Sequence, residues 1–320
     1  MEGPDVVVYP YTFAPIYKEK IWGGRALERL FGRRLPEGAT IGESWELADL
    51  AGGQSVVADG PDAGKTLRDL LAEKASAVLG PSADLPDGRF PLLLKLLDAN
   101  EVLSLQVHPD ASTAAAMGPP ATAKTECWYV LESRGGYILK GVRPGVTEAD
   151  FRSALAGGDD AEALRRLVRR VEVSAGDFHY LPGGTVHALG AGVVVAEIQT
   201  PSETTFRVSD WGRGREIHVA EALRSIHYGP PGPVPGACED VLVRSGHFAV
   251  LRRQAGAGRT EIAGGRCAAW MVLGGEAALR AEAGAAELTP GRTALLPAGA
   301  GPMELTVADG LTWLEVTLPQ

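Results

Sequence analysis

The 320-residue sequence predicts a mainly β protein with two β-barrels, the second a degenerate copy of the first. A phrase at 176–187, GDFHYLPGGTVH, recurs at 291–302 as GRTALLPAGAGP, with glycine, proline and glycine at the same spacing. A second echo precedes each phrase, because WYVL at 128–131 returns as WMVL at 270–273. The 41 glycines and 22 prolines separate short apolar runs, which is typical of many short strands joined by turns.

Polar residues set the two copies apart. His187 ends the first phrase, whereas Pro302 stands at the matching position of the second. Glu126, two positions before WYVL, is matched by Ala268, two positions before WMVL. Only the first copy keeps these polar side chains, so we expect the chemistry there.

The first elements alternate between strand and helix patterns. Residues 1–60 are expected to form strands and turns. Residues 62–79 are expected to form an amphipathic helix, because leucines recur at helical spacing and Gly80 follows as a stop signal. The apolar runs at 90–99 and 102–108 then return to a strand pattern.

A helical insertion is expected at about 143–170. The segment between WYVL and the glycine–proline phrase of the first copy is longer than the segment between WMVL and the matching phrase of the second copy. The first copy therefore has room for extra residues there. Thr147 and Asp150 form a capping-box-like start, and the segment AEALRRLVRR completes the helical pattern.

The segment GPPGPVPG at 229–236 predicts a linker. It divides the chain into a catalytic domain, residues 1–232, and a degenerate domain, residues 233–320, without metal ligands. Helices inserted around the first of two barrels are the simplest arrangement of these elements.

Composition excludes two kinds of partner. The net charge is −9 and no basic run reaches five residues, so we expect no nucleic-acid partner. The most apolar stretch, residues 90–105, is interrupted by Lys95, Asp98 and Glu101, so no membrane span is expected. A few local cations could still bind a small anionic ligand.

The cysteines and the N-terminus predict a cytoplasmic protein. Cys127, Cys238 and Cys267 are odd in number and lack C-x-x-C spacing, which is typical of a reducing compartment. The first residues have no basic region ahead of an apolar segment, so we expect no signal peptide.

Four residues of the first copy are suited to a metal ion. Gln106 and His108 share one face of a predicted strand, Glu126 opens the next strand pattern, and His187 follows the PGG turn. Inward-facing side chains converge in a small barrel. Two imidazoles, a carboxylate and an amide oxygen suit one catalytic Zn²⁺ per chain, although Mn²⁺ or Fe²⁺ could occupy the same set.

Three cations stand near these ligands in the sequence. Lys95 interrupts an apolar strand, where a charge is costly unless it faces a wet or ligand-filled cavity. An edge position with an amine reaching solvent is the alternative. Lys124 lies two residues before Glu126, and Arg207 follows the strand that carries Glu197. Three cations near a metal predict an anionic ligand, with phosphate the leading candidate.

Carboxylates complete the candidate site. Glu197 ends a valine run and is expected to point into the barrel, where it could act as an acid or base. Glu43 and Ser44, beside Trp45, are candidate substrate contacts at the opening of the same predicted barrel. The remaining histidines show no ligand spacing and are expected to be structural or surface residues: His179, His218, His227 and His247.

These residues carry a resemblance to a known family. The phrase at 176–187 resembles the second cupin motif. The segments PLLLKLLDANEVLSLQVHPD, KTECWYVL, PGGTVHAL and EIQTPSETTFRVSDW resemble the type I mannose-6-phosphate isomerases in their short bacterial form. The resemblance is close over about residues 10–230 and loose beyond them.

The resemblance implies cupin-like, jelly-roll barrels and a zinc-dependent isomerase that interconverts mannose 6-phosphate and fructose 6-phosphate. It places the zinc ligands on Gln106, His108, Glu126 and His187. It also places the active-site arginine on Arg207, an acidic residue on Glu197 and pocket lysines on Lys95 and Lys124.

Two other functions use part of the same pattern. A metal-bearing cupin that senses a sugar would keep the ligands but would need neither a base nor an arginine. A cupin dioxygenase would need open iron positions, whereas Gln106 and three nearby cations fit an anionic sugar better.

Overall fold

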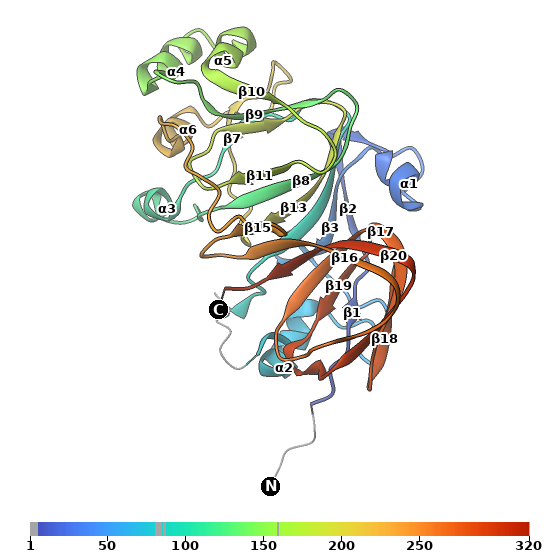
Figure 1. Ribbon diagram of the computed structural model, residues 1–320. Helices are drawn as coiled ribbons and strands as arrows, with labels where there is room; N and C mark the ends of the chain where they lie inside the picture. The colour runs from blue at the N-terminus through green and yellow to red at the C-terminus, as the bar shows by residue number, and fades with distance from the viewer. Residues whose placement is uncertain (1–5, 81–84, 86–87, 159, 320) are drawn as a thin grey trace.

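The computed structural model describes residues 6–80, 85, 88–158 and 160–319. The predicted mainly β class is confirmed, because antiparallel sheets dominate the described chain. The sheets of the first copy and the insertion helices lie at one end of the molecule, and the C-terminal sheet lies at the other (Figure 1).

Two sheets belong to the first copy. One has six strands, in the spatial order β11 (Phe178–Leu181), β8 (Glu126–Ser133), β13 (Val193–Gln199), β6 (Leu93–Ala99), β3 (Ile41–Leu47) and β2 (Ile16–Gly24). The other has five, in the order β10 (Val168–Glu172), β9 (Tyr137–Val142), β12 (His187–Leu189), β7 (Leu105–Val107) and β14 (Phe206–Ser209). A separate pair joins β4 (Asp49–Leu50) to β5 (Gly53–Gln54).

The third sheet has seven strands, mostly from the C-terminal residues. Its order is β1 (Tyr11–Thr12), β19 (Thr293–Leu296), β17 (Ala268–Ala281), β20 (Met303–Thr317), β16 (Ala249–Ile262) and β15 (Val241–Arg244), with β18 (Gly284–Leu288) beside β17. Because β1 pairs with β19, an N-terminal segment completes the C-terminal sheet. The division at residue 232 stays a prediction.

Helices occur where the pattern predicts them and also at three further places. The helix expected at 62–79 is α2 (Leu67–Leu79), and the insertion contains α4 (Glu148–Leu155) and α5 (Ala161–Leu167). The helical pattern predicted for AEALRRLVRR is wrong at its end, because residues 168–170 belong to β10, which pairs with β9. The Thr147 backbone N–H donates to Asp150 Oδ2 at 2.8 Å, which confirms the capping box. The sequence did not indicate α1 (Ala26–Phe31), α3 (Ala111–Met117) or α6 (Val219–Ser225).

The expectation of only strands and turns over residues 1–60 is therefore wrong at α1. This helix is short and depends on a distant contact, because the Ala26 backbone N–H donates to Asp98 Oδ2 at 2.6 Å. A carboxylate at a helix N-terminus satisfies a free N–H group and interacts favourably with the helix dipole. Because the capping carboxylate comes from β6, the local sequence pattern could not predict this helix.

The internal repeat is visible in the strand pairing. Leu181 pairs with Glu126 across β11 and β8, and Leu296 pairs with Ala268 at the matching place across β19 and β17. Trp128 pairs with Glu197 in the first copy, and Trp270 pairs with Glu315 in the second. The two copies therefore share their pairing register as well as their sequence echo.

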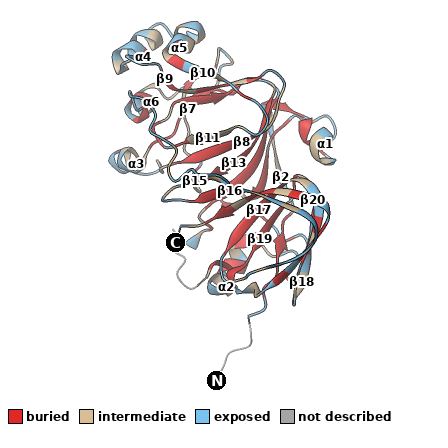
Figure 2. Cartoon of the chain, in the orientation of Figure 1, coloured by how far each residue is buried: buried red, intermediate tan, exposed pale blue. Residues whose placement is uncertain are grey.

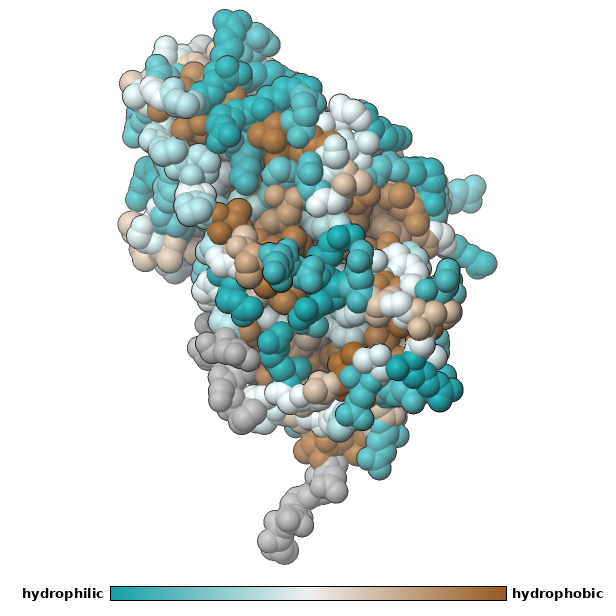
Figure 3. Space-filling view, in the orientation of Figure 1, coloured by the Kyte–Doolittle hydropathy of each residue, from teal (hydrophilic) through white to brown (hydrophobic). Residues whose placement is uncertain are grey.

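The core occupies both sides of the C-terminal sheet. A large apolar cluster joins residues of β8, such as Cys127 and Tyr129, to residues of β17 and β20, such as Met271 and Val316. A second cluster, on the other face of the C-terminal sheet, includes Trp270 and Trp313. Buried residues follow the strands, whereas α3, α4 and α5 present exposed residues (Figure 2). Hydrophilic and hydrophobic residues are interspersed over the face in Figure 3.

Candidate metal and substrate site

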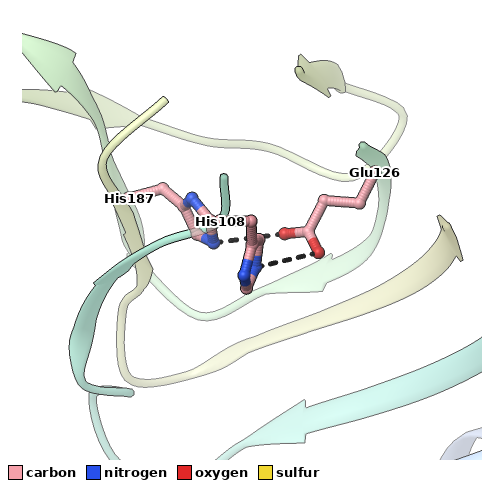
Figure 4. Close-up of side chains that lie close together, drawn as sticks. All are labelled: His108, Glu126 and His187. Carbon is pink, nitrogen blue, oxygen red and sulfur yellow. Dashed lines mark ion pairs between the residues drawn. The ribbon is translucent and has the colours of Figure 1, made fainter. Parts of the chain in front are cut away.

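Three predicted metal ligands lie together in the first copy. His108 follows β7, Glu126 begins β8 and His187 begins β12, and their ligand atoms lie within 4.8 Å of one another. All three side chains are buried. The imidazoles point toward the two carboxylate oxygens of Glu126, with His187 Nε2 at 3.2 Å and His108 Nε2 at 3.4 Å (Figure 4).

The PGG turn holds two of these ligands near each other. The Gly184 backbone N–H donates to the His108 carbonyl at 2.8 Å, and Gly184 has a φ of +90° that favours glycine. A Cβ on Gly183 would lie 2.7 Å from the Asp110 backbone, so only glycine permits this approach. The turn glycines therefore bring the QVHPD segment beside His187.

Each imidazole is oriented by a backbone carbonyl. His108 Nδ1 lies 2.8 Å from the Thr204 carbonyl, and His187 Nδ1 lies 2.8 Å from the Thr185 carbonyl. A carbonyl can only accept, so each Nδ1 carries a proton and each Nε2 faces Glu126. This is the arrangement that metal-binding histidines require.

The charge states also suit a cation. Burial, with the Lys124 charge adding to it, lowers the pKa of His108 to about 3, which keeps its imidazole neutral. Burial alone would raise the pKa of the Glu126 carboxyl, but neighbouring positive charge, first that of the Lys124 ammonium, holds that pKa well below its usual range. His108 Nε2 and Glu126 Oε1 are buried without a hydrogen-bond partner, and Glu126 Oε2 is buried with the Lys124 ammonium 3.0 Å away. Such atoms fit a bound divalent ion, because buried polar groups are otherwise satisfied.

Gln106 lies beside the cluster. Its backbone pairs with His187 on one side and with Arg207 on the other, so all three side chains face the same way. The amide nitrogen of Gln106 lies 3.2 Å from His187 Nε2. Rotating the Gln106 side-chain amide by 180° exchanges its nitrogen and oxygen and places the oxygen next to His187 Nε2. The two orientations are distinguished by the hydrogen bonds that each can form.

A cavity of about 280 Å³ opens beside the cluster. Gln106 and Lys124, which contact the cluster, line its wall. The predicted residues Glu43, Lys95, Glu197 and Arg207 line it as well. The structure thus brings together all but one of the residues that the sequence singled out for the site.

Ser44 is the exception, because the structure does not place it where it could contact a substrate in the cavity. The residue is fully buried and lies outside the cavity lining. Its hydroxyl donates to Glu46 Oε1 at 2.6 Å and accepts from Arg33 at 2.8 Å. Neighbouring residues on a strand point to opposite faces, so Glu43 and Ser44 of β3 cannot both face the cavity.

Lys95 and Glu197 form a buried ion pair in the cavity wall. Lys95 Nζ donates to Glu197 Oε1 at 2.9 Å and to Gln199 Oε1 at 2.7 Å. Burial would lower the pKa of the Lys95 ammonium, but Glu197 and Glu43 outweigh that effect and raise it. Lys95 is therefore paired in the buried wall of the cavity, and the edge position with an exposed amine is excluded.

Arg207 differs from the other described cations of the cavity. Lys20, Lys124 and Arg215 each have a carboxylate oxygen within 3.1 Å, as Lys95 does. Arg207 instead donates to the Glu216 carbonyl, and its Nε is buried without a hydrogen-bond partner. Burial and the neighbouring Arg215 lower the pKa of Arg207 although Asp210 and Glu216 act in the opposite direction, so an anionic ligand would stabilise its charge.

Several cavity residues were not predicted from the sequence. Trp128, Trp22, Ser104, Lys20 and Arg215 also line the cavity. Trp128 lies in the KTECWYVL segment, and its place opposite Glu197 could be inferred only from the strand register. His218, expected to be structural, accepts from the Arg207 backbone N–H at 3.1 Å and so supports that strand.

Comparison with known proteins identifies the family. Residues 11–138 match the model of the phosphomannose isomerase type I catalytic domain. The chain is 37% identical over 261 residues to the probable mannose-6-phosphate isomerase GmuF of Bacillus subtilis, covering 77% of this chain and 80% of that protein. This chain belongs to the type I phosphomannose isomerase family.

Two further relatives agree with this assignment. Mannose-6-phosphate isomerase ManA of Bacillus subtilis is 39% identical over 224 residues, covering 68% of each chain. A crystal structure of the mannose 6-phosphate isomerase from Bacillus subtilis superposes with a TM-score of 0.84 at 30% identity. It covers 97% of this chain and 99% of that one, so the similarity extends through the C-terminal sheet.

Membrane insertion by helices has no support in the structure. Among the described residues, no helix is both long and apolar enough to cross a bilayer.

Proposed function

We propose that this protein is a zinc-dependent aldose–ketose isomerase that interconverts mannose 6-phosphate and fructose 6-phosphate through an enediolate. The observation that supports it most is the buried cluster His108, Glu126 and His187 directly beside a cavity with carboxylates and cations. Relatives that are 37% and 39% identical to this chain are named as mannose-6-phosphate isomerases, one of them as a probable one.

The zinc ligands would be His108, Glu126, His187 and Gln106. When bound, the ion would act as a Lewis acid that stabilises negative charge on the oxygens at C1 and C2. The donor set of two imidazoles, a carboxylate and an amide would hold zinc, which can become five-coordinate and so accept a substrate oxygen in addition to four protein ligands. We propose one zinc per chain.

Arg207 would meet the anionic part of the substrate. Its guanidinium lines the cavity with Nε lacking a hydrogen-bond partner, and it can form two parallel hydrogen bonds to a phosphate or to a developing oxyanion. Either contact holds C1 and C2 in place, and the remote phosphate supplies binding energy for that purpose.

Glu197 is the candidate proton acceptor. The reaction removes a proton from one carbon and returns it to its neighbour, so it needs a base beside both carbons. Glu197 is buried in the cavity wall, and each of its oxygens accepts one hydrogen bond. An ionised carboxylate has about four acceptor sites, so Glu197 can still receive a proton.

A coupled assay with mannose 6-phosphate tests the proposal. We expect turnover by the purified protein, loss of turnover after chelation, and recovery when Zn²⁺ is added back. Glucose 6-phosphate serves as the control substrate, because it differs at C2. Phosphosugar binding without turnover would favour a sugar-sensing cupin, and oxygen consumption would favour a dioxygenase. Undiminished turnover in metal-free protein would contradict zinc dependence.

A further inference from the structure

Trp128 lies at the centre of the proposed active site although it neither binds the proposed metal nor carries a titratable group. The residue is on β8, is almost completely buried, and lines the cavity. Its indole N–H donates to Glu197 Oε2 at 2.8 Å. Its ring also meets the His187 ring edge-on, with centroids 5.4 Å apart at an angle of 83°.

Strand register places Trp128 in a row with the cavity charges. Glu197 of β13 pairs with Trp128 on one side and with Lys95 of β6 on the other. Directly opposed residues point to the same face of a sheet, so all three side chains enter the barrel together. The indole therefore reaches one carboxylate oxygen while the ammonium reaches the other.

Two donors on opposite oxygens fix the plane of the Glu197 carboxylate. The last torsion of a glutamate side chain is broad when no partner restrains it. Lys95 is itself restrained, because it also donates to Gln199 Oε1 at 2.7 Å. Gln199 in turn donates to the Thr200 and Ser202 carbonyls. Without the indole, Oε2 would lose its partner among the described residues and the carboxylate could rotate.

We infer that Trp128 is a positioning residue that orients Glu197 for proton transfer through its indole N–H. The inference rests on the proposed isomerase function, in which Glu197 acts on the substrate. Small misplacements of a reacting group can cost about 10²-fold in rate. Trp128 needs no contact with the reacting carbons to have this effect.

The second copy supplies a matched control. Trp270 occupies the corresponding register, opposite Glu315, and is equally buried. Its indole nitrogen has no hydrogen-bond partner, and the nearest cation contacts of Glu315 are Arg253 at 3.4 Å and Arg266 at 3.5 Å. A tryptophan at this position can thus serve as core alone, and the bond to a carboxylate is specific to the first copy.

Kinetics of Trp128→Phe, Glu197→Gln and the double variant test the inference, with Trp270→Phe as control. Phenylalanine keeps an aromatic ring and removes the N–H. We expect Trp128→Phe to lower kcat about 10- to 100-fold, with KM for mannose 6-phosphate within about twofold and metal content unchanged. Trp270→Phe should leave kcat unchanged.

The double variant separates positioning from packing. If Trp128 acts through Glu197, the double variant should be no slower than Glu197→Gln alone, because residues that act as a unit are strongly non-additive. If the rate losses of the two single variants multiply in the double variant, the two residues act independently and the inference is overturned. Loss of metal from Trp128→Phe would do the same, since the residue would then act through His187.

A magnetic resonance experiment tests the hydrogen bond without catalysis. In ¹⁵N-tryptophan-labelled, metal-free protein, Trp128→Phe and Trp270→Phe each identify one indole N–H signal by its absence. We expect Glu197→Gln to move the Trp128 signal and leave the Trp270 signal in place. If both stay in place, the bond to Glu197 does not exist in solution and the inference fails. If the Trp128 signal moves but the unsubstituted protein does not turn over mannose 6-phosphate, the contact stands and the proposed function fails.

Discussion

The two β copies of this chain share their strand pairing but differ in what fills them. At the Glu126 position the second copy has Ala268, and opposite its glutamate it has Leu251 where the first copy has Lys95. The indole rings of Trp270 and Trp313, with centroids 4.6 Å apart, pack within the second copy. The first copy has a cavity and a metal-ligand cluster in the corresponding region.

This difference separates what builds the fold from what builds the site. The register is common to both copies, so neither the metal ligands nor the buried ion pair is needed to set it. A buried ion pair is often no more stabilising than apolar residues of similar volume. The buried Lys95–Glu197 pair is therefore explained by the chemistry of the first copy rather than by the stability of its sheet.

The largest effect is expected from His187→Ala compared with Pro302→Ala at the matching position of the repeat. Removing His187 takes away one metal ligand, so the protein should lose both bound metal and turnover, a larger loss than the about 10- to 100-fold typical of residues that only support a ligand. Elemental analysis and the coupled assay measure both. Pro302→Ala should keep wild-type metal content.

The same measurement tests how many sites the chain has. One metal per chain is expected, because the matching positions of the second copy carry Ala268 and Pro302. Two metals per chain, or full activity in metal-free His187→Ala protein, would contradict the assignment of the chemistry to the first copy alone.

Arg207→Ala should affect catalysis far more than metal binding. Arg207 pairs in register with Gln106 but donates to the Glu216 carbonyl, away from the cluster. Removing one positioned charge donor typically lowers the rate by about 10²- to 10³-fold. Lysine should restore only part of the rate, because a point charge lacks the planar fork of arginine. Near-normal turnover by Arg207→Ala with metal bound would make the arginine structural.

Lys95→Leu gives the first copy the residue of the second. It leaves the Glu197 carboxylate buried without its cation, which typically destabilises a protein by about 3 to 5 kcal/mol. Urea unfolding at pH 7 measures the loss. Arg253→Leu is the control in the second copy, where the Arg253 side chain is 40% exposed, and it should cost less than about 1 kcal/mol. Equal losses in the free energy of unfolding for the two variants would contradict the interpretation that the ion pair is buried in the first copy and exposed in the second.

The sequence predicts the site better than it predicts the minor elements. The metal cluster follows from the repeat, because His187 and Glu126 stand where the second copy has Pro302 and Ala268. Alternation along a strand also predicts that Gln106 faces the same way as His108, and the structure brings Gln106 beside His187. These inferences use short-range spacing, which a single sequence records directly.

Contacts between distant residues explain what could not be predicted. The α1 helix depends on Asp98, which lies 72 residues from Ala26. The polar segment around Glu43 suggests that Ser44 faces the cavity, whereas its hydroxyl is taken up by Arg33 and Glu46. The role of Trp128 depends on its register against Glu197, which no local pattern contains.

The smallest expected effect concerns the pH dependence of Glu43, which lies outside the repeated phrases. Burial would raise the pKa of the Glu43 carboxyl, but Lys95 and Lys20 outweigh it and lower the pKa to about 2. A carboxyl whose pKa is lowered by folding stabilises the protein above its unfolded pKa, about 4.5, and loses that contribution as the pH falls toward 2. Glu43→Gln should therefore lower the free energy of unfolding by about 2 kcal/mol at pH 7. The gap to wild type should narrow between pH 5 and pH 3 in urea titrations. A gap that stays constant over this range would show that Glu43 is lost as a hydrogen-bond acceptor only, and that its charge contributes nothing.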